Sequence, residues 1–196
     1  MHYCLLWADE EAAYVSDYDA QGKLCAEHAL KGQGFETPGK WPVLQALTEG
    51  GYLLGMDDKA YHVQADGSLV QSITVQDGHM ESFVQLENGR KFAVYQDLSK
   101  KSPGRNALIA VAELDLEKNA VSAARTLSVA ESKISAFEGT RMVYCDSDFA
   151  YLIDMDEAKD EQLIDLKRQS ILASQIEGIY GTREEILVVS RDPSEG

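Results

Sequence analysis

Acidic residues stand directly after several apolar runs of this sequence, where a strand would end in a turn. LLWA precedes Asp9, LLGM precedes Asp57, AVYQ precedes Asp97, MVYC precedes Asp146 and LVVSR precedes Asp192. Carboxylates gathered on one surface can attract a basic protein, hold a cation or carry out acid–base chemistry. The set that we expect on one rim of the molecule is Asp9, Glu10, Glu11, Asp57, Asp58, Asp97, Asp146 and Asp148.

A second interpretation of these carboxylates is purely local. Aspartate favours turns because its side chain accepts hydrogen bonds from nearby backbone N–H groups. This accounts well for a single aspartate, but less well for the whole set, because the turns expected at the opposite ends of the strands use Gly and Asn more freely.

Two aromatic residues lie in a long loop beside the acidic set. The segment KGQGFETPGKWP, residues 31–42, contains Phe35 and Trp41. Aromatic side chains on loops can anchor a protein partner. The alternative is that Trp41 folds back over the core, since Trp is usually largely buried. We expect Phe35 and Trp41 to contribute to partner binding together with the acidic rim.

Catalytic and metal-binding signals are weak. The sequence has no GxSxG, Walker A, GxGxxG or HExxH motif, and its four histidines are scattered. The segment Asp154-Met-Asp156-Glu157 suggests calcium superficially but lacks the Gly and the spacing of an EF-hand loop. We therefore expect no catalytic residue, no metal site and no cofactor.

The acidic turns recur because the chain repeats a unit of four antiparallel strands, here named a to d. The acidic turn joins strands b and c, and tight Gly-containing turns join a to b. Asn88-Gly89 and Asp66-Gly67 favour two-residue hairpin turns, because they tolerate positive φ. The expected copies are His2–Leu30 (b, c and d), Val43–Val75, Met80–Val129 and Lys133–Arg168 (all four strands), and Ser174–Asp192 (a and b).

This pattern resembles a small β-propeller. The resemblance implies an all-β domain over residues 1–196, with four blades of four antiparallel strands, closed when the C-terminal strands complete the N-terminal blade. Copies one and five both supply a strand b, so the composite blade would carry a fifth strand. The alternative is that the ring is open and two chains associate. An antiparallel β-sandwich is the other fold considered. Residues 114–131 are expected to form a hairpin turning at Lys118-Asn119 rather than a helix.

Composition limits the partners. Eighteen basic against thirty-three acidic residues give a formal net charge of −15, which repels nucleic acid and anionic membranes. Cys4, Cys25 and Cys145 lie in expected strands among apolar neighbours, so we expect buried free thiols and a cytoplasmic protein. The N-terminus shows no basic region and no apolar run long enough for a signal peptide.

In charge, size and compartment the chain is similar to bacterial immunity proteins, which mask basic nuclease toxins with an acidic face. The resemblance implies a non-catalytic binding module that is a monomer within a heterodimer with a basic toxin or nuclease domain. The alternatives are a small propeller hydrolase or lyase that uses the rim carboxylates, and a scaffold domain that associates with itself through unclosed blades.

Overall fold

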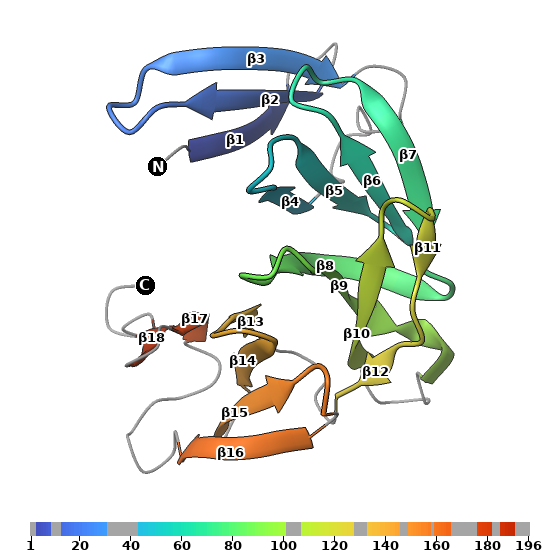
Figure 1. Cartoon of the computed structure of the whole chain (residues 1–196), viewed down its shortest axis with the longest axis vertical. Coiled ribbons are helices and arrows are strands. Elements are labelled where there is room, and N and C mark those ends of the chain that lie inside the picture. Colours follow the sequence, from blue (N-terminus) through green and yellow to red (C-terminus); the bar gives the residue numbers. More distant parts are fainter. Residues whose placement is uncertain are drawn as a thin grey trace.

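The computed structural model describes residues 3–8, 13–30, 43–100, 107–127, 133–145, 149–157, 159–165, 176–181 and 185–190. These residues form antiparallel sheets joined in chain order (Figure 1). Apart from a single 3₁₀ turn, η1 (Leu98–Lys100), the described part contains no helix. No helix there is long and apolar enough to cross a membrane.

Each expected copy of the repeat corresponds to one sheet. The first sheet contains β1 (Tyr3–Ala8), β2 (Ala13–Tyr18) and β3 (Leu24–Leu30), and the second contains β4 (Val43–Ala46), β5 (Tyr52–Met56), β6 (Lys59–Val63) and β7 (Leu69–Thr74). The third contains β8 (Gly78–Gln85), β9 (Lys91–Asp97), β10 (Leu108–Asp115), β11 (Ala120–Val121) and β12 (Arg125–Thr126). The fourth contains β13 (Lys133–Ala136), β14 (Arg141–Cys145), β15 (Phe149–Asp154) and β16 (Lys159–Asp165), and the fifth contains β17 (Ile176–Gly181) and β18 (Ile186–Ser190). The expected all-β fold and the hairpin after β10 are confirmed.

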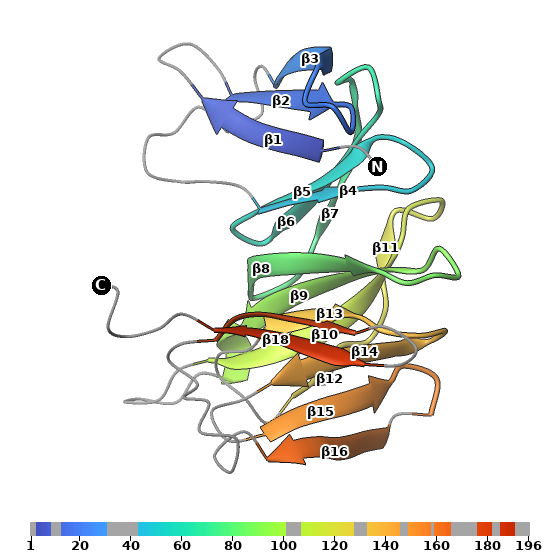
Figure 2. The ribbon, with the colours of Figure 1, turned by 90° about the vertical axis from the view of Figure 1, so that its left-hand side faces the viewer.

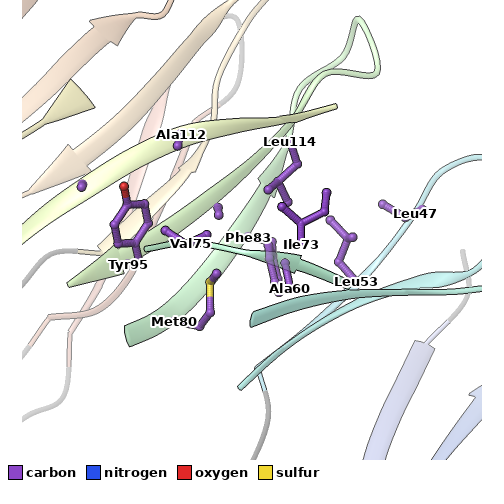
Figure 3. Packing of buried hydrophobic residues seen from close by; sticks show 12 residues of the cluster. Leu47, Leu53, Ala60, Ile73, Val75, Met80, Phe83, Tyr95, Ala112 and Leu114 are labelled. Carbon is purple, nitrogen blue, oxygen red and sulfur yellow. The ribbon is translucent and has the colours of Figure 1, made fainter. Parts of the chain in front are cut away.

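Neighbouring sheets pack face to face through apolar side chains. In β9, Phe92 and Val94 belong to the cluster shared with the fourth sheet, whereas Ala93 and Tyr95 belong to the cluster shared with the second. The middle strands are therefore buried on both faces, which explains why they read as continuous apolar runs rather than as alternating ones. Figure 3 shows the junction between the second and third sheets, where Leu53 and Ile73 meet Phe83 and Leu114.

The sheets do not close into a ring. They follow one another around an arc, and the first and fifth sheets lie on either side of its opening (Figure 1). Figure 2 shows the first and second sheets at one end of the molecule and the fourth at the other. Neighbouring sheets pack face to face as the two layers of a sandwich do, so this feature of the alternative fold, the antiparallel β-sandwich, is present.

Closure by the two termini, as expected from the sequence, is not what the structure shows. Within the described residues β17 and β18 pair only with each other, and β1 pairs only with β2. Ile176 and Ile179 of the fifth sheet are buried against the fourth sheet, on Val143 and Cys145, so the fifth sheet stacks there as a layer of its own. The first sheet already holds three strands, so adding two more would exceed a four-stranded blade.

The hairpin turns differ from the expected two-residue form. Leu86 N–H donates to Arg90 O at 2.9 Å and Gly89 N–H donates to Leu86 O at 2.9 Å, so three residues form the turn and Gly89 takes a φ of 83°. The turn at Gly67 has the same pattern. Glycine serves here at the left-handed position of a three-residue turn.

Candidate functional site

The b–c turn of the second sheet carries the best-defined part of the expected acidic rim. Asp57 and Asp58 join β5 to β6, and Asp57 adopts a left-handed backbone with φ of 51°, which Asp tolerates better than most residues. The turn is fixed by two backbone hydrogen bonds of 2.7 Å: Met80 N–H donates to Asp57 O, and Val75 N–H donates to Asp58 O.

Asp77 joins this edge, although the sequence analysis did not select it. It lies in the link from β7 to β8 and has a φ of 52°. Its carbonyl accepts a 2.8 Å hydrogen bond from Leu98 N–H, immediately after Asp97. The d–a link therefore sits between the b–c turns of the second and third sheets, as the repeat predicts. A signal was present in the sequence, because in a repeat of antiparallel strands a to d the d–a link lies at the same end of the strands as the b–c turn.

Asp97 reaches this edge, but its carboxylate is buried. The residue is 7% exposed, and Oδ1 accepts hydrogen bonds from both the backbone N–H and the hydroxyl of Ser99. Burial, followed by the charge of Asp97, raises the pKa of Tyr95. Asp97 thus holds the turn into η1, whereas Asp57 and Asp77 are exposed and Asp58 is partly exposed. We call these three residues the described rim.

The other predicted site residues are not placed by the structure. Those lying outside the described residues are Asp9, Glu10, Glu11, Phe35, Trp41, Asp146 and Asp148. The predicted roles of these residues in partner binding stay predictions.

Ion pairs gather at the opposite edge, where the a–b and c–d turns lie. Arg90 donates to both carboxylate oxygens of Glu113, at 2.9 and 2.8 Å, and pairs with Asp156 at 2.6 Å. Hydrogen bonds from Arg90 to Glu113 and Asp156 raise the pKa of Arg90 despite its partial burial. The other pairs of this edge in the described chain are Lys91 with Glu49, Lys118 with Asp115, Arg125 with Asp160, and Arg141 with Glu138.

The pair between Lys91 and Glu49 connects the third sheet to the second. Burial alone would raise the pKa of Glu49, but hydrogen bonds from Lys91 and Gln85 outweigh it and lower the pKa to about 2. Several described basic residues are therefore neutralised by acids at this edge, away from Asp57, Asp58 and Asp77.

A shallow hollow of about 550 Å³ lies at the same edge, between residues 88–91 and 113–122 of the third sheet. Its charged lining is engaged locally, because Arg90 binds Glu113 and Asp115 binds Lys118. Among the described residues there is no group of three or more His, Cys, Asp or Glu side chains able to hold a metal ion.

The described cysteines differ from the expected pattern in one case. Cys145 is buried, Cys4 is half-buried, and Cys25 is exposed on β3. The expectation that all three thiols are buried is therefore wrong for Cys25, which lies on β3, a strand that pairs only with β2 among the described residues.

Comparison with known proteins identifies relatives by fold only. No protein-family model matches the sequence, and no curated protein matches it. A protein of unknown function from Bacteroides caccae is similar in structure, with a TM-score of 0.65 and 13% identity over 97% of this chain. A luciferin-regenerating enzyme has a TM-score of 0.58 and 12% identity over 94% of the chain, and the Dos1 propeller has 0.55 and 14% over 90%.

The fold is all-β, and one of the similar structures is a propeller. The chain spans 69%, 64% and 46% of the lengths of these three proteins, respectively. At such identities the likeness concerns the arrangement of the sheets alone, and the proteins that share this arrangement include both an enzyme and the Dos1 propeller. Function must therefore be argued from the surfaces of this chain.

Proposed function

We propose that this chain is a non-catalytic protein-binding module whose acidic rim docks a basic protein. The observation that carries the proposal is the separation of charge between the two edges of the sheets. Asp57, Asp58 and Asp77 share one edge, whereas the ion pairs of Arg90, Lys91 and Arg141 lie at the other. A chain with net charge −15 favours a basic partner, and the edge that carries the three aspartates is the one at which the predicted acidic turns gather.

The partner class is a basic toxin, with nuclease domains as the first candidates. Nuclease domains carry positive charge to bind nucleic acid, and a protein with an acidic edge can cover that charge. Complementary charge accelerates encounter and fixes the orientation of docking, while aromatic anchors supply much of the affinity. Phe35 and Trp41 are the aromatic residues that the proposal assigns to this second role. The complex is proposed to be a heterodimer in the cytoplasm.

The architecture proposed with this function is a set of propeller blades. The likeness to the Dos1 propeller and the face-to-face packing of successive sheets support it. In such an arrangement all b–c turns and d–a links lie on one side, which would place Asp9, Glu10, Asp146 and Asp148 beside the described rim. No observation on the described residues favours the hydrolase or lyase alternative.

Association rates with purified basic nuclease domains test the proposal. The variant Asp57→Asn/Asp58→Asn/Asp77→Asn should associate about tenfold more slowly at low salt, because electrostatic steering is reduced. The rate difference should shrink as added salt screens the charges. Stopped-flow or surface-plasmon measurements give both quantities.

The matched control is Glu117→Gln/Glu157→Gln/Glu161→Gln, which removes three charges from exposed residues: Glu117 and Glu157 in turns of the opposite edge, and Glu161 within β16. It should leave the association rate within about twofold of the wild type, since the removed charges do not face the partner. If both variants associate more slowly by the same factor, the effect depends on net charge alone and not on the rim. Binding that ignores the rim variant would contradict the proposal.

A further inference from the structure

The two ends of the arc each expose an apolar sheet face. On the first sheet the face turned away from the second sheet carries Leu5, which is 51% exposed, and Trp7 and Tyr14, which are partly buried. We call this the leading face. On the fifth sheet the face turned away from the fourth carries Tyr180, Leu187 and Val189, exposed by 54%, 59% and 37%. We call this the trailing face.

Both faces belong to strands whose sequences resemble strands that are buried on two sides. β18 reads ILVVS, and its Ile186 and Val188 pack toward the fourth sheet while Leu187 and Val189 face outward. In β14, which reads RMVYC, Met142 and Tyr144 pack on one neighbouring sheet and Val143 and Cys145 pack on the other. The outward residues of β18 thus occupy the positions that, in interior sheets, contact the next sheet along the arc.

The leading face is ordered before any partner arrives. The Trp7 ring stacks on Tyr14, with centroids 4.4 Å apart and planes 14° from parallel. Trp7 Nε1 donates to Ser16 Oγ at 2.8 Å, and that hydroxyl donates to Glu27 at 2.8 Å. A flat aromatic platform whose N–H is already satisfied loses little conformational freedom when it is covered.

Every sheet junction in the molecule has the same polarity. At all four junctions, a sheet uses its face turned toward the C-terminal end of the arc, and the following sheet uses its face turned toward the N-terminal end. The trailing face therefore continues a series of interfaces whose next member is a leading face. A two-stranded sheet is also marginal without such support.

We propose that the trailing face of one molecule binds the leading face of a second copy of this chain, head to tail. This inference does not depend on the acidic rim and concerns different residues. Because the contact joins two different surfaces, it is heterologous. A dimer still has one uncovered leading face and one uncovered trailing face, so further copies can add to it or the assembly can close into a ring. The small area of the fifth sheet predicts weak, concentration-dependent association.

Sedimentation velocity over a range of concentrations tests the proposal with single-face variants. Leu5→Lys should block the leading face, and Leu187→Lys should block the trailing face, each raising the apparent dissociation constant at least about tenfold. Both side chains are more than half exposed, so folding should be unaffected. Leu69→Lys, on β7 of the second sheet and also exposed, is the matched control and should associate as the wild type does.

Mixing the two variants gives the decisive result. Leu5→Lys keeps an intact trailing face and Leu187→Lys keeps an intact leading face, so the mixture should form a one-to-one dimer and no larger species. If Leu5→Lys alone still dimerises, the contact is two-fold through the fifth sheet and the proposal fails. It also fails if the wild type stays monomeric at every concentration. A double variant, Leu5→Cys/Leu187→Cys, tests whether the two faces meet within one molecule: a cross-link inside a single chain would also contradict the proposal. Val189→Glu replaces Leu187→Lys should that variant not fold.

Discussion

A thiol, a carboxylate and a phenol meet at the junction between the first and second sheets. Cys4 and Asp17 are paired across β1 and β2, and the Tyr52 hydroxyl donates a hydrogen bond to Asp17. Burial, then the charge and hydrogen bond of Asp17, raise the pKa of Cys4 to about 12. Burial and the bond to Asp17 also raise the pKa of Tyr52. Because both groups stay protonated near neutral pH, the cluster links two sheets and does not supply a nucleophile.

The reactivity of Cys4 should therefore respond to Asp17. At pH 9 we expect iodoacetamide to modify Cys4 at least about tenfold more slowly than the exposed Cys25, because the thiolate is the reacting form. Asp17→Asn removes a negative charge beside the thiol, so the pKa of Cys4 should fall and its modification should accelerate. Mass spectrometry of peptides after timed quenching measures each site. Buried Cys145 is the internal control, and equal rates at Cys4 and Cys25 in the wild type would contradict the argument.

Aspartates at turns show why the site could be predicted only in part. Asp57 and Asp97 follow apolar strands in the same way, and both were expected to face a partner. The structure separates them: Asp97 is buried and its carboxylate accepts hydrogen bonds from Ser99, whereas Asp57 is exposed. Asp19 and Asp66 likewise accept backbone hydrogen bonds within their own turns. The sequence predicts that an aspartate lies in a turn, but it does not show whether the folded chain buries the carboxylate, as at Asp97, or leaves it exposed, as at Asp57 and Asp66.

Among the elements, the hairpin turns depend on glycines in the left-handed region. Gly50 and Gly89 hold equivalent positions, with φ of 97° and 83°. Gly51 is unusual because it follows the left-handed position and also has a positive φ, of 79°. A Cβ atom at Gly51 would lie 2.5 Å from the backbone oxygen of Val63, whereas one at Gly89 would meet nothing within 4 Å.

These two glycines separate backbone strain from steric overlap. Gly89→Ala should lower the free energy of unfolding by about 1 kcal/mol, the cost of a left-handed alanine. Gly51→Ala should lower it by a further 1–3 kcal/mol or so, since its Cβ also displaces a backbone atom of β6. Urea denaturation of both variants measures the difference. Equal losses would mean that the β4–β5 turn relaxes away from Val63.

Most strands could be predicted because two kinds of signal coincide. Apolar runs mark strands b, and Gly or Asp turns bound them, so β5, β9 and β14 were expected within one or two residues. Turn length was less accessible, because the pair Asn88-Gly89 suits both a two-residue turn and the left-handed position of a three-residue turn. The difference depends on which backbone atoms pair, as Leu86 and Arg90 do here.

At the scale of the whole molecule, the repeat pattern could not predict whether the sheets close into a ring. Counting strands within each copy predicts sheets, because strand pairing is local. Whether the first and last sheets meet depends on the angle between successive sheets, which the packing of residues such as Phe83 and Tyr144 sets at each junction. No repeat spacing encodes that angle, so an arc and a ring share one sequence pattern.

An arc in which each sheet packs only on its neighbours should lose structure from its ends. Ile179→Ala removes apolar contact at the junction between the fourth and fifth sheets, and Phe83→Ala removes it between the second and third. Each should cost about 3 kcal/mol or more. In hydrogen exchange at low protein concentration, Ile179→Ala should accelerate exchange in β17 and β18 while β9 and β10 keep their protection. Phe83→Ala should reduce protection in both the second and third sheets. Nearest-neighbour coupling predicts this contrast, and a uniform loss of protection in both variants would show that the sheets unfold as one cooperative unit.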